Sequence, residues 1–364
     1  MKQNLVFAAR LSPIILRPNM KIMKKKLPLK KISSIIEITE ASFEASKPKS
    51  SLTHDGGGVI GLAMSSSLIE ITQASFEAKK SSAVTHDGGG GLSNSSSWVK
   101  SRLLGRGAYG SVYLAKSKTD ETERAIKTAE LSRATSLMDE ARILIRLNSP
   151  YVVRCYDAEI VREENQYNLV LEYCSGKTIA DLIEDNHGEL LESEVKLFAR
   201  DILSGLNYIH DRGIVHCDIK PDNLLLCPIS LRFRANGYLA KIGDFGLAME
   251  KGSMEYGDGY GHKRGTTRYM SPELMSHGMV DFGADVWAFG CSVLEMLSGE
   301  IVWGEHGDLC FDDWANIIGH SDLMPRQPVW LSTQAKDFLS KCLERDVYKR
   351  WSAHSLANHP FAAL

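Results

Sequence analysis

Two polar motifs in the second half of the chain, about twenty residues apart, constrain its fold more than any other feature. Residues 216–223 read HCDIKPDN and residues 244–246 read DFG. In-line phosphoryl transfer needs a carboxylate that orients the attacking hydroxyl group and accepts its proton, together with oxygen ligands for Mg²⁺. Asp218 suits the first role, and Asn223 and Asp244 suit the second. A turn would explain any one of these residues alone, but their order and spacing make a chance match negligible.

A glycine-rich segment far upstream supplies a phosphate-binding element for the same chemistry. Residues 105–112 read GRGAYGSV, and glycines there let backbone N–H groups approach phosphate oxygens. Alone this pattern is weak, because it also opens dinucleotide-binding folds. It gains weight from Lys127 in the following predicted strand and from Glu140 on the next predicted helix, which would hold the lysine by an ion pair. Lys220, two residues beyond Asp218, would neutralise charge that develops on the transferred phosphate.

The hydrophobic pattern predicts a strand-rich part followed by a helical part. Residues 98–173 alternate apolar residues with turn signals, which predicts short strands, with one helix among them over 137–145. Residues 195–209 follow the i, i+3, i+4 pattern of an amphipathic helix. Residues 285–298 are apolar on nearly every face and end at Gly299, as expected of a fully buried helix.

The first 97 residues differ from the rest. Residues 1–31 hold nine Lys or Arg and no Asp or Glu, and the remainder carries 34 basic and 45 acidic side chains. Residues 36–45 return almost unchanged at 69–78, but two polar copies are too few for a solenoid. We expect residues 1–97 to form a disordered leader. As alternatives, the basic segment could act as a nuclear-localisation signal or bind an anionic surface. The repeated segment could act as a docking peptide.

The seven cysteines are scattered and include no CxxC pair. This pattern predicts reduced thiols rather than a disulfide framework or a zinc site. No run approaches the ~18 apolar residues that a membrane-spanning helix needs. We therefore expect no transmembrane segment and a cytoplasmic protein, with the nucleus as an alternative.

Taken in order, five motifs resemble the signature set of eukaryotic protein kinases: the glycine loop, AIK at 125–127, HCDIKPDN, DFG and SPE at 271–273. The resemblance covers residues 98–361 and implies an α+β, two-lobed protein kinase fold. It places a small β-rich N-lobe at about 98–174 and a larger α-helical C-lobe at about 175–361. Within that superfamily, three stretches are most similar to plant mitogen-activated protein kinase kinase kinases: LNSPYVV (147–153), GIVHCDIK (213–220) and QAKDFLSKCLERDVYKRWSA (334–353).

The resemblance implies a protein serine/threonine kinase that uses ATP and Mg²⁺ and phosphorylates a mitogen-activated protein kinase kinase. We expect ATP and a protein substrate as partners and no nucleic acid; the oligomeric state stays open. Two alternatives remain: a receptor-associated or other signalling serine/threonine kinase, and a pseudokinase adaptor that uses the fold only to bind partners. Loss of Lys127, Asp218 or Asp244 is the usual mark of such an adaptor, and all three are present.

The resemblance also implies where the nucleotide binds. Adenine would lie between four apolar side chains, beside the gatekeeper Leu171, and would pair with the backbone of residues 172–174. The metal ligands would be Asn223 and Asp244. The expected nucleotide-binding residues are Leu104, Gly105, Gly107, Gly110, Val112, Ala125, Lys127, Glu140, Glu172, Cys174 and Leu225.

Three further contacts follow from the same resemblance. Thr266 would bond Asp218 and Lys220, an arrangement that favours serine/threonine over tyrosine specificity. The other two are structural: Glu273 would pair with Arg350, and Asp285 would anchor the backbone of the catalytic loop.

Two segments depart from the kinase pattern. Cys217 stands where many kinases have an arginine that pairs with a phosphorylated activation segment, and a thiol cannot pair with phosphate. We therefore expect activity to depend only weakly on phosphorylation of Ser253, Tyr256 or Thr267. The second departure is a long connection over 227–239, whose Asn-Gly pair at 236–237 predicts a hairpin turn.

Overall fold

The computed structural model describes residues 95–107, 110–232, 234–252 and 264–363. Apart from residues 95–97, the predicted disordered leader lies outside these ranges, and so do Ser253 and Tyr256.

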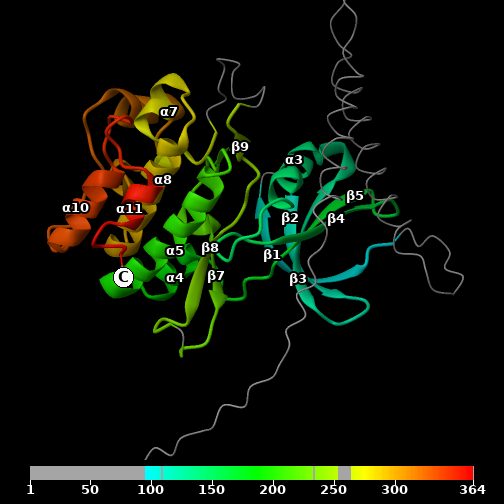
Figure 1. The fold of residues 1–364 in the computed structure, drawn as a ribbon. Coiled ribbons are helices and arrows are strands. Elements are labelled where there is room, and N and C mark those ends of the chain that lie inside the picture. Colours follow the sequence, from blue (N-terminus) through cyan, green and yellow to red (C-terminus); the bar gives the residue numbers. More distant parts are fainter. Residues whose placement is uncertain (1–94, 108–109, 233, 253–263, 364) are drawn as a thin grey trace, which may run out of the picture. The chain divides into compact units, whose positions relative to one another are not determined.

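A five-stranded antiparallel sheet forms the first lobe (Figure 1). The strand order is β1-β2-β3-β5-β4, so that β3 lies at the centre of the sheet. The strands are β1 (Trp98–Gly107), β2 (Gly110–Ser117), β3 (Glu123–Glu130), β4 (Cys155–Val161) and β5 (Gln166–Leu171). A 3-10 turn, η1 (Leu131–Arg133), and the helix α3 (Thr135–Leu144) connect β3 to β4.

Helix α3 packs against β4 and β5 through the apolar face that its sequence pattern predicts. Leu137, Met138, Ala141 and Leu144 are all buried. Ile145 is the exception, because the helix ends at Leu144 and the side chain of Ile145 is 49% exposed. The helix therefore ends one residue before the end of the predicted range 137–145.

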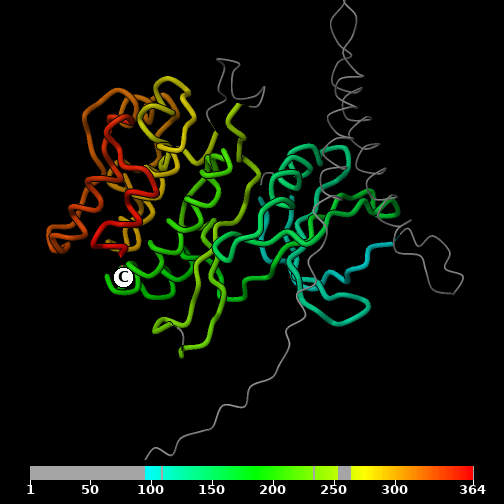
Figure 2. Tube along the Cα trace, viewed as in Figure 1, coloured from blue at the N-terminus to red at the C-terminus, as the bar shows by residue number. Residues whose placement is uncertain are grey.

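Helices dominate the second lobe. They are α4 (Ile179–Asp185), α5 (Glu192–His210), α7 (Pro272–His277), α8 (Phe282–Ser298), α9 (Phe311–Trp314), α10 (Thr333–Cys342) and α11 (Ala353–Ala357). Shorter elements lie between them: β6 (Ile214–Val215), η2 (Pro221–Asn223), β7 (Leu224–Pro228), β8 (Tyr238–Ile242), β9 (Met249–Glu250), η3 (Thr267–Tyr269), η4 (Gly304–His306) and the π-helix η5 (Ala315–His320). Figure 2 shows the trace passing from the sheet lobe, which runs from cyan to green, to the green, yellow and red helical lobe.

Helix α8 is the centre of the helical lobe, as its uniformly apolar sequence predicts. It begins three residues earlier than predicted and ends before Gly299, and its residues from Ala284 to Leu297 are all buried. Phe289 of α8 contacts Phe338 of α10 edge to face at a centroid distance of 6.0 Å. Each buried side chain of this size stabilises the fold by about 1.5–3 kcal/mol, so this contact region fixes α8 firmly.

The connection between the catalytic-loop motif and DFG forms the hairpin that the Asn-Gly pair predicts. Strands β7 and β8 pair antiparallel, with Leu225 opposite Lys241. The connection runs over residues 229–237 and is longer than a two-residue turn, but Gly237 donates to the Arg234 carbonyl at its end. The hairpin fixes which residues of β8 lie beside β7.

The described chain thus confirms the predicted α+β protein kinase fold, a sheet lobe followed by a helical lobe. Within the described ranges, no helix combines the length and apolar character needed to span a membrane.

Candidate active site

Lys127 lies between one carboxylate from each lobe. It projects from β3, and its Nζ is 2.6 Å from Glu140 Oε2 on α3 and 2.7 Å from Asp244 Oδ1 of the DFG motif. The Lys127 and Glu140 side chains are buried, whereas that of Asp244 is 46% exposed. The adjacent Asp139 pairs instead with Arg142 on the exposed face of α3. The structure therefore brings together the three predicted charged residues and selects Glu140 over its neighbour.

These charges shift one another's ionisation. Burial lowers the pKa of Lys127, but the charges of Glu140 and Asp244 outweigh this effect and hold it above its ordinary value. Burial raises the pKa of Asp244, but the Lys127 ammonium outweighs it and the pKa lies below normal. For Glu140, burial dominates and the pKa is raised. Lys127 and Asp244 are therefore held in their charged forms.

The glycine loop and the predicted adenine-binding residues of β2, β3 and β5 share one face of the sheet through strand register. Gly105 lies opposite Val112, and Val112 lies opposite Lys127. Directly opposed residues point to the same side of an antiparallel pair, so Val112 covers the region next to the lysine. Ala125, two residues before Lys127, points to that side too and is paired with Leu171 of β5. The register thus places these predicted residues along one surface.

The three predicted glycines of the loop differ in what they do. A Cβ atom at Gly105 or Gly107 would have no described protein atom within 4 Å, so the backbone is open to a ligand at both positions. Gly110 has φ +139°, and a Cβ atom there would lie 2.2 Å from the Thr128 carbonyl oxygen. Gly110 is therefore required by the close approach of β2 to β3. Residues 108–109 lie outside the described ranges.

The segment after β5 and the strand β7 bring together the remaining adenine-binding candidates. Leu171 ends β5, and the N–H of Glu172 donates to the Arg154 carbonyl at 2.8 Å. This bond uses the N–H of Glu172. The carbonyl of Glu172 is therefore the backbone group that remains to pair with a base. Leu225 of β7 bridges to Thr178 just after this segment. Leu104, at the irregular part of β1, is 37% exposed.

Asp285 of α8 holds the catalytic loop through its backbone, as predicted. Its Oδ2 accepts from the His216 N–H at 2.8 Å, and its Oδ1 accepts from the Cys217 N–H at 2.9 Å. The His210 ring also contacts Asp285 Oδ2, at 2.9 Å. Two charge-assisted bonds from adjacent residues fix the orientation of the loop immediately before Asp218.

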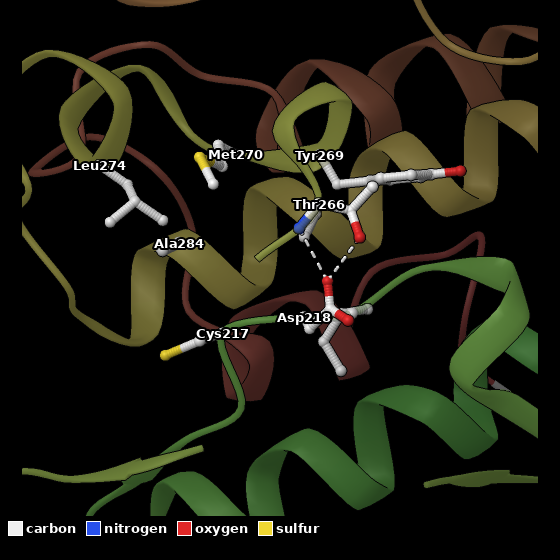
Figure 3. Close-up of a pocket in the computed structure, with 9 residues that line it drawn as sticks. Cys217, Asp218, Thr266, Tyr269, Met270, Leu274 and Ala284 are labelled. Atoms are coloured by element: carbon white, nitrogen blue, oxygen red, sulfur yellow. Dashed lines mark hydrogen bonds between the residues drawn. The ribbon is translucent and has the colours of Figure 1, made fainter. Parts of the chain in front are cut away.

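Asp218 is the meeting point of the catalytic loop and the later activation segment (Figure 3). Its Oδ1 accepts from the Thr266 N–H at 2.9 Å and from the Thr266 hydroxyl at 2.8 Å. Its Oδ2 accepts from Asn223 Nδ2 at 2.9 Å and lies 3.2 Å from Lys220 Nζ. Lys220 Nζ also donates to Thr266 Oγ1 at 2.6 Å. The predicted contacts of Thr266 with Asp218 and Lys220 are confirmed.

The approach of the activation segment to Asp218 depends on Gly265. This residue has φ +111°, and a Cβ atom there would lie 2.4 Å from the Cys217 carbonyl oxygen. A side chain at position 265 would push Thr266 away from the carboxylate that it bonds.

Cys217 points away from this cluster. Figure 3 shows its sulfur directed to the opposite side of the loop from the Asp218 carboxylate. Cys217 is buried in an apolar cluster with Val215 and Met249, against which Phe282 packs. Its backbone has φ 66°, a left-handed conformation that is strained for a residue with a side chain. An apolar environment thus occupies the place where many kinases have a phosphate-binding arginine.

The residues present fit ATP and Mg²⁺. Asp244 and Asn223 offer the carboxylate and amide oxygens that a hard cation prefers. Asn223 uses its amide nitrogen to bond the Asp218 backbone and side chain, at 2.8 and 2.9 Å, which leaves its oxygen as the atom that would bind a cation. Lys127 supplies a fixed positive charge, and the glycine loop supplies open backbone.

Away from the reacting groups, the predicted ion pair between Glu273 and Arg350 is present. Arg350 donates to both Glu273 oxygens, at 2.6 and 2.9 Å, and both side chains are buried. This two-point contact joins α7 to the segment before α11.

Sequence reasoning missed two residues that contact the segment after β5. Lys241 of β8 pairs with both Glu172 oxygens, at 2.6 and 2.8 Å. The Cys227 and Cys174 sulfur atoms lie 2.7 Å apart. The predicted hairpin could have indicated Lys241, because pairing its two strands in the observed register places Lys241 opposite Leu225. A cysteine pair 53 residues apart left no comparable signal.

Comparison with known proteins agrees with this geometry. Residues 98–362 match the family model of the protein kinase domain. Arabidopsis thaliana mitogen-activated protein kinase kinase kinase 17 is 36% identical over 270 residues, which cover 72% of this chain and 69% of the relative. The kinases of that name numbered 18 and 20 are each 37% identical, covering 73% of this chain and 77% and 78% of the relatives. Given this match and the arrangement of Lys127, Asp218 and Asp244, the chain belongs to the protein kinase family.

Proposed function

We propose that this chain is an ATP- and Mg²⁺-dependent protein serine/threonine kinase that acts as a mitogen-activated protein kinase kinase kinase. Its substrate would be the hydroxyl group of a serine or threonine in a mitogen-activated protein kinase kinase. The observation that carries the proposal is the convergence of Thr266, Lys220 and Asn223 on Asp218. The names of the relatives support the position in the cascade.

Asp218 is the group that would orient the substrate hydroxyl and accept its proton. Both its oxygens are held by hydrogen bonds, so the carboxylate is fixed before a substrate arrives. Such preorganisation avoids rearrangement during the reaction and contributes to lowering the barrier. Lys220, 3.2 Å from Asp218, would stabilise the negative charge that develops on the transferred phosphoryl group.

Lys127, Asp244 and Asn223 would position the nucleotide. Lys127 would bind the α- and β-phosphates, and Glu140 would hold its ammonium in place. Asp244 and Asn223 would hold Mg²⁺, which when bound neutralises phosphate charge and orients the phosphates. Leu104, Val112, Ala125 and Leu225 would enclose the adenine ring.

The contact between Lys220 and Thr266 supports serine/threonine specificity. The two residues meet at 2.6 Å beside the proposed base, and they shape the space into which the substrate hydroxyl would enter. A cytoplasmic location, with the nucleus as an alternative, fits the cysteines, none of which forms a disulfide.

The test is transfer of labelled γ-phosphate from Mg-ATP to protein. The wild-type chain should phosphorylate a catalytically inactive mitogen-activated protein kinase kinase in strong preference to a generic basic protein. Asp244→Asn and Lys127→Met should each reduce the transfer about 100-fold or more, because each removes a fixed charge from the site. Circular dichroism and thermal unfolding would verify that the variants fold.

Different results would lead to different conclusions. Equal phosphorylation of the basic protein and the kinase kinase would refute the place in the cascade and favour another signalling kinase. Absence of transfer by a wild-type protein that still binds nucleotide would refute the catalytic assignment and favour an adaptor.

A further inference from the structure

Two cysteines meet immediately beside the proposed adenine-binding segment. Cys174 follows β5, Cys227 lies in β7, and their sulfur atoms are 2.7 Å apart. Backbone bonds hold the two segments together: Gly176 N–H donates to the Leu226 carbonyl, and Leu226 N–H donates to the Lys177 carbonyl, both at 2.9 Å. The backbone pairing between the two segments therefore holds the two sulfur atoms near each other.

This geometry suits formation of a covalent bond. The sulfur atoms of a disulfide are about 2.05 Å apart, so bond formation requires the two sulfurs to approach by less than about 1 Å. Neither thiol is in a disulfide in the structure. Cys174 is buried, whereas Cys227 is partly exposed, so a small oxidant would reach Cys227 first.

The surroundings also make the two thiols chemically unequal. The hydrogen bond with Cys174 lowers the pKa of Cys227, and the positive charge of Lys241 adds to this effect against the opposing effect of burial. The same hydrogen bond, together with burial, raises the pKa of Cys174. Cys227, which is the more exposed of the two and has the lowered pKa, is therefore the thiol that ionises more readily where an oxidant can reach it, and thiolates, not thiols, react with oxidants.

A metal site is the competing explanation. Ligand atoms of Glu172, Cys174 and Cys227 all lie within 4.8 Å of one another. However, Lys241 already occupies both Glu172 oxygens, at 2.6 and 2.8 Å. Its ammonium neutralises the carboxylate and repels a cation, which leaves two sulfur ligands where structural zinc sites have four ligands. The charges favour oxidation over metal binding.

We propose that Cys174 and Cys227 form a redox-modification site that hydrogen peroxide converts into an intramolecular disulfide. The Cys227 thiolate attacks the peroxide O–O bond, which gives a sulfenic acid at Cys227 and a hydroxide ion that takes up a proton to become water. The Cys174 sulfur then attacks the sulfenic sulfur and releases a second water. The two thiols lose two electrons in total, and hydrogen peroxide gains them.

The consequence for the enzyme rests on the proposed function. If the backbone at residues 172–174 pairs with adenine, a bond from Cys174 to β7 changes the position of that backbone. Loss of one hydrogen bond to the base would weaken nucleotide binding about fivefold to tenfold. A thiol reductant would reverse the effect, so the site would regulate the kinase by oxidation.

The chemical part is tested on the full chain with hydrogen peroxide, followed by alkylation of remaining thiols and peptide mapping without reductant. Wild type and Cys310→Ser, a matched control that removes an exposed thiol, should give a peptide linked through Cys174 and Cys227. Cys227→Ser should give none, and Cys174→Ser should accumulate a sulfenic acid at Cys227 that dimedone traps. A linkage through other cysteines, or none in wild type, would overturn the proposal.

Two further measurements separate the proposal from its alternatives. Zinc alone, added to reduced protein, should not be retained after dialysis; stoichiometric retention that Cys227→Ser abolishes would overturn the proposal in favour of a metal site. Affinity for a fluorescent ATP analogue should fall about fivefold to tenfold on oxidation of wild type and stay constant in Cys227→Ser. An unchanged affinity in linked wild type would overturn the regulatory role. Failure of reduced wild type to bind the analogue would refute the proposed function, while the linked peptide would still establish the site.

Discussion

Glu295 should make the stability of the helical lobe depend on pH. This glutamate lies in α8 and is 5% exposed. It accepts from the Tyr269 hydroxyl, at 2.9 and 3.1 Å to its two oxygens, and from the Val302 N–H at 2.7 Å. Burial raises its pKa to about 7, an effect to which Asp222 adds, although the two hydrogen bonds and Arg268 partly oppose it.

The sign and size of the effect follow from this shift. An unfolded chain returns the carboxyl group to a pKa of 4.5, so between that pH and about 7 the folded state alone holds the proton. The contribution to stability is fully present below pH 4.5 and is lost as the pH rises through about 7. From pH 5 to pH 8 the loss amounts to about 2.5 kcal/mol for this one group.

The assay is urea-induced unfolding of wild type and Glu295→Gln between pH 5 and pH 8. The amide cannot titrate, so the free energy of unfolding of wild type relative to the variant should fall by about 2.5 kcal/mol over this range. Glu300→Gln, which alters an exposed carboxylate just beyond the same helix, serves as the matched control and should follow wild type. A difference between wild type and Glu295→Gln that stays constant with pH would refute the reasoning.

Three further predictions concern other contacts. Thr266→Ala should reduce kcat about 10-fold to 100-fold in the phosphotransfer assay with little change in thermal stability, because it frees Asp218, and Thr266→Ser should restore most of the activity. Phosphatase treatment and Thr267→Ala should leave turnover within about twofold of wild type, since Cys217 offers phosphate no cation; abolished turnover in either case would contradict this. Arg350→Met should lower the free energy of unfolding by about 3–5 kcal/mol in urea titrations, because a buried carboxylate loses its partner; a loss below about 1 kcal/mol would show that water replaces the arginine.

The charged groups of the site could be predicted from the sequence because they occur in short motifs whose backbone is local. Asp218, Lys220 and Asn223 lie within six residues, so their spacing alone places them on one loop. Glu140 was harder to distinguish from Asp139, since both lie on the same predicted helix. The structure separates them by the direction in which α3 faces the sheet.

The remaining contacts depend on how distant segments meet, which hydrophobic periodicity does not encode. The pairs Lys241–Glu172 and Cys227–Cys174 form because β7 and β8 pack beside the segment that follows β5. The sequence marked the turn of this hairpin but not the surface against which it packs. The same limit explains Ile145, where a periodic pattern continues one residue beyond the end of the helix.

The position of Lys127 between two carboxylates has a consequence for nucleotide entry. In the structure its ammonium is already balanced by Glu140 from its own lobe and by Asp244 from the other. If Lys127 binds nucleotide phosphates as proposed, binding would be an exchange of partners: Lys127 would keep Glu140 and release Asp244, whose half-exposed oxygens would become free for a cation. The ammonium of Lys127 would stay paired with Glu140 throughout this exchange. The site would thus avoid the high free energy of an unpaired buried charge.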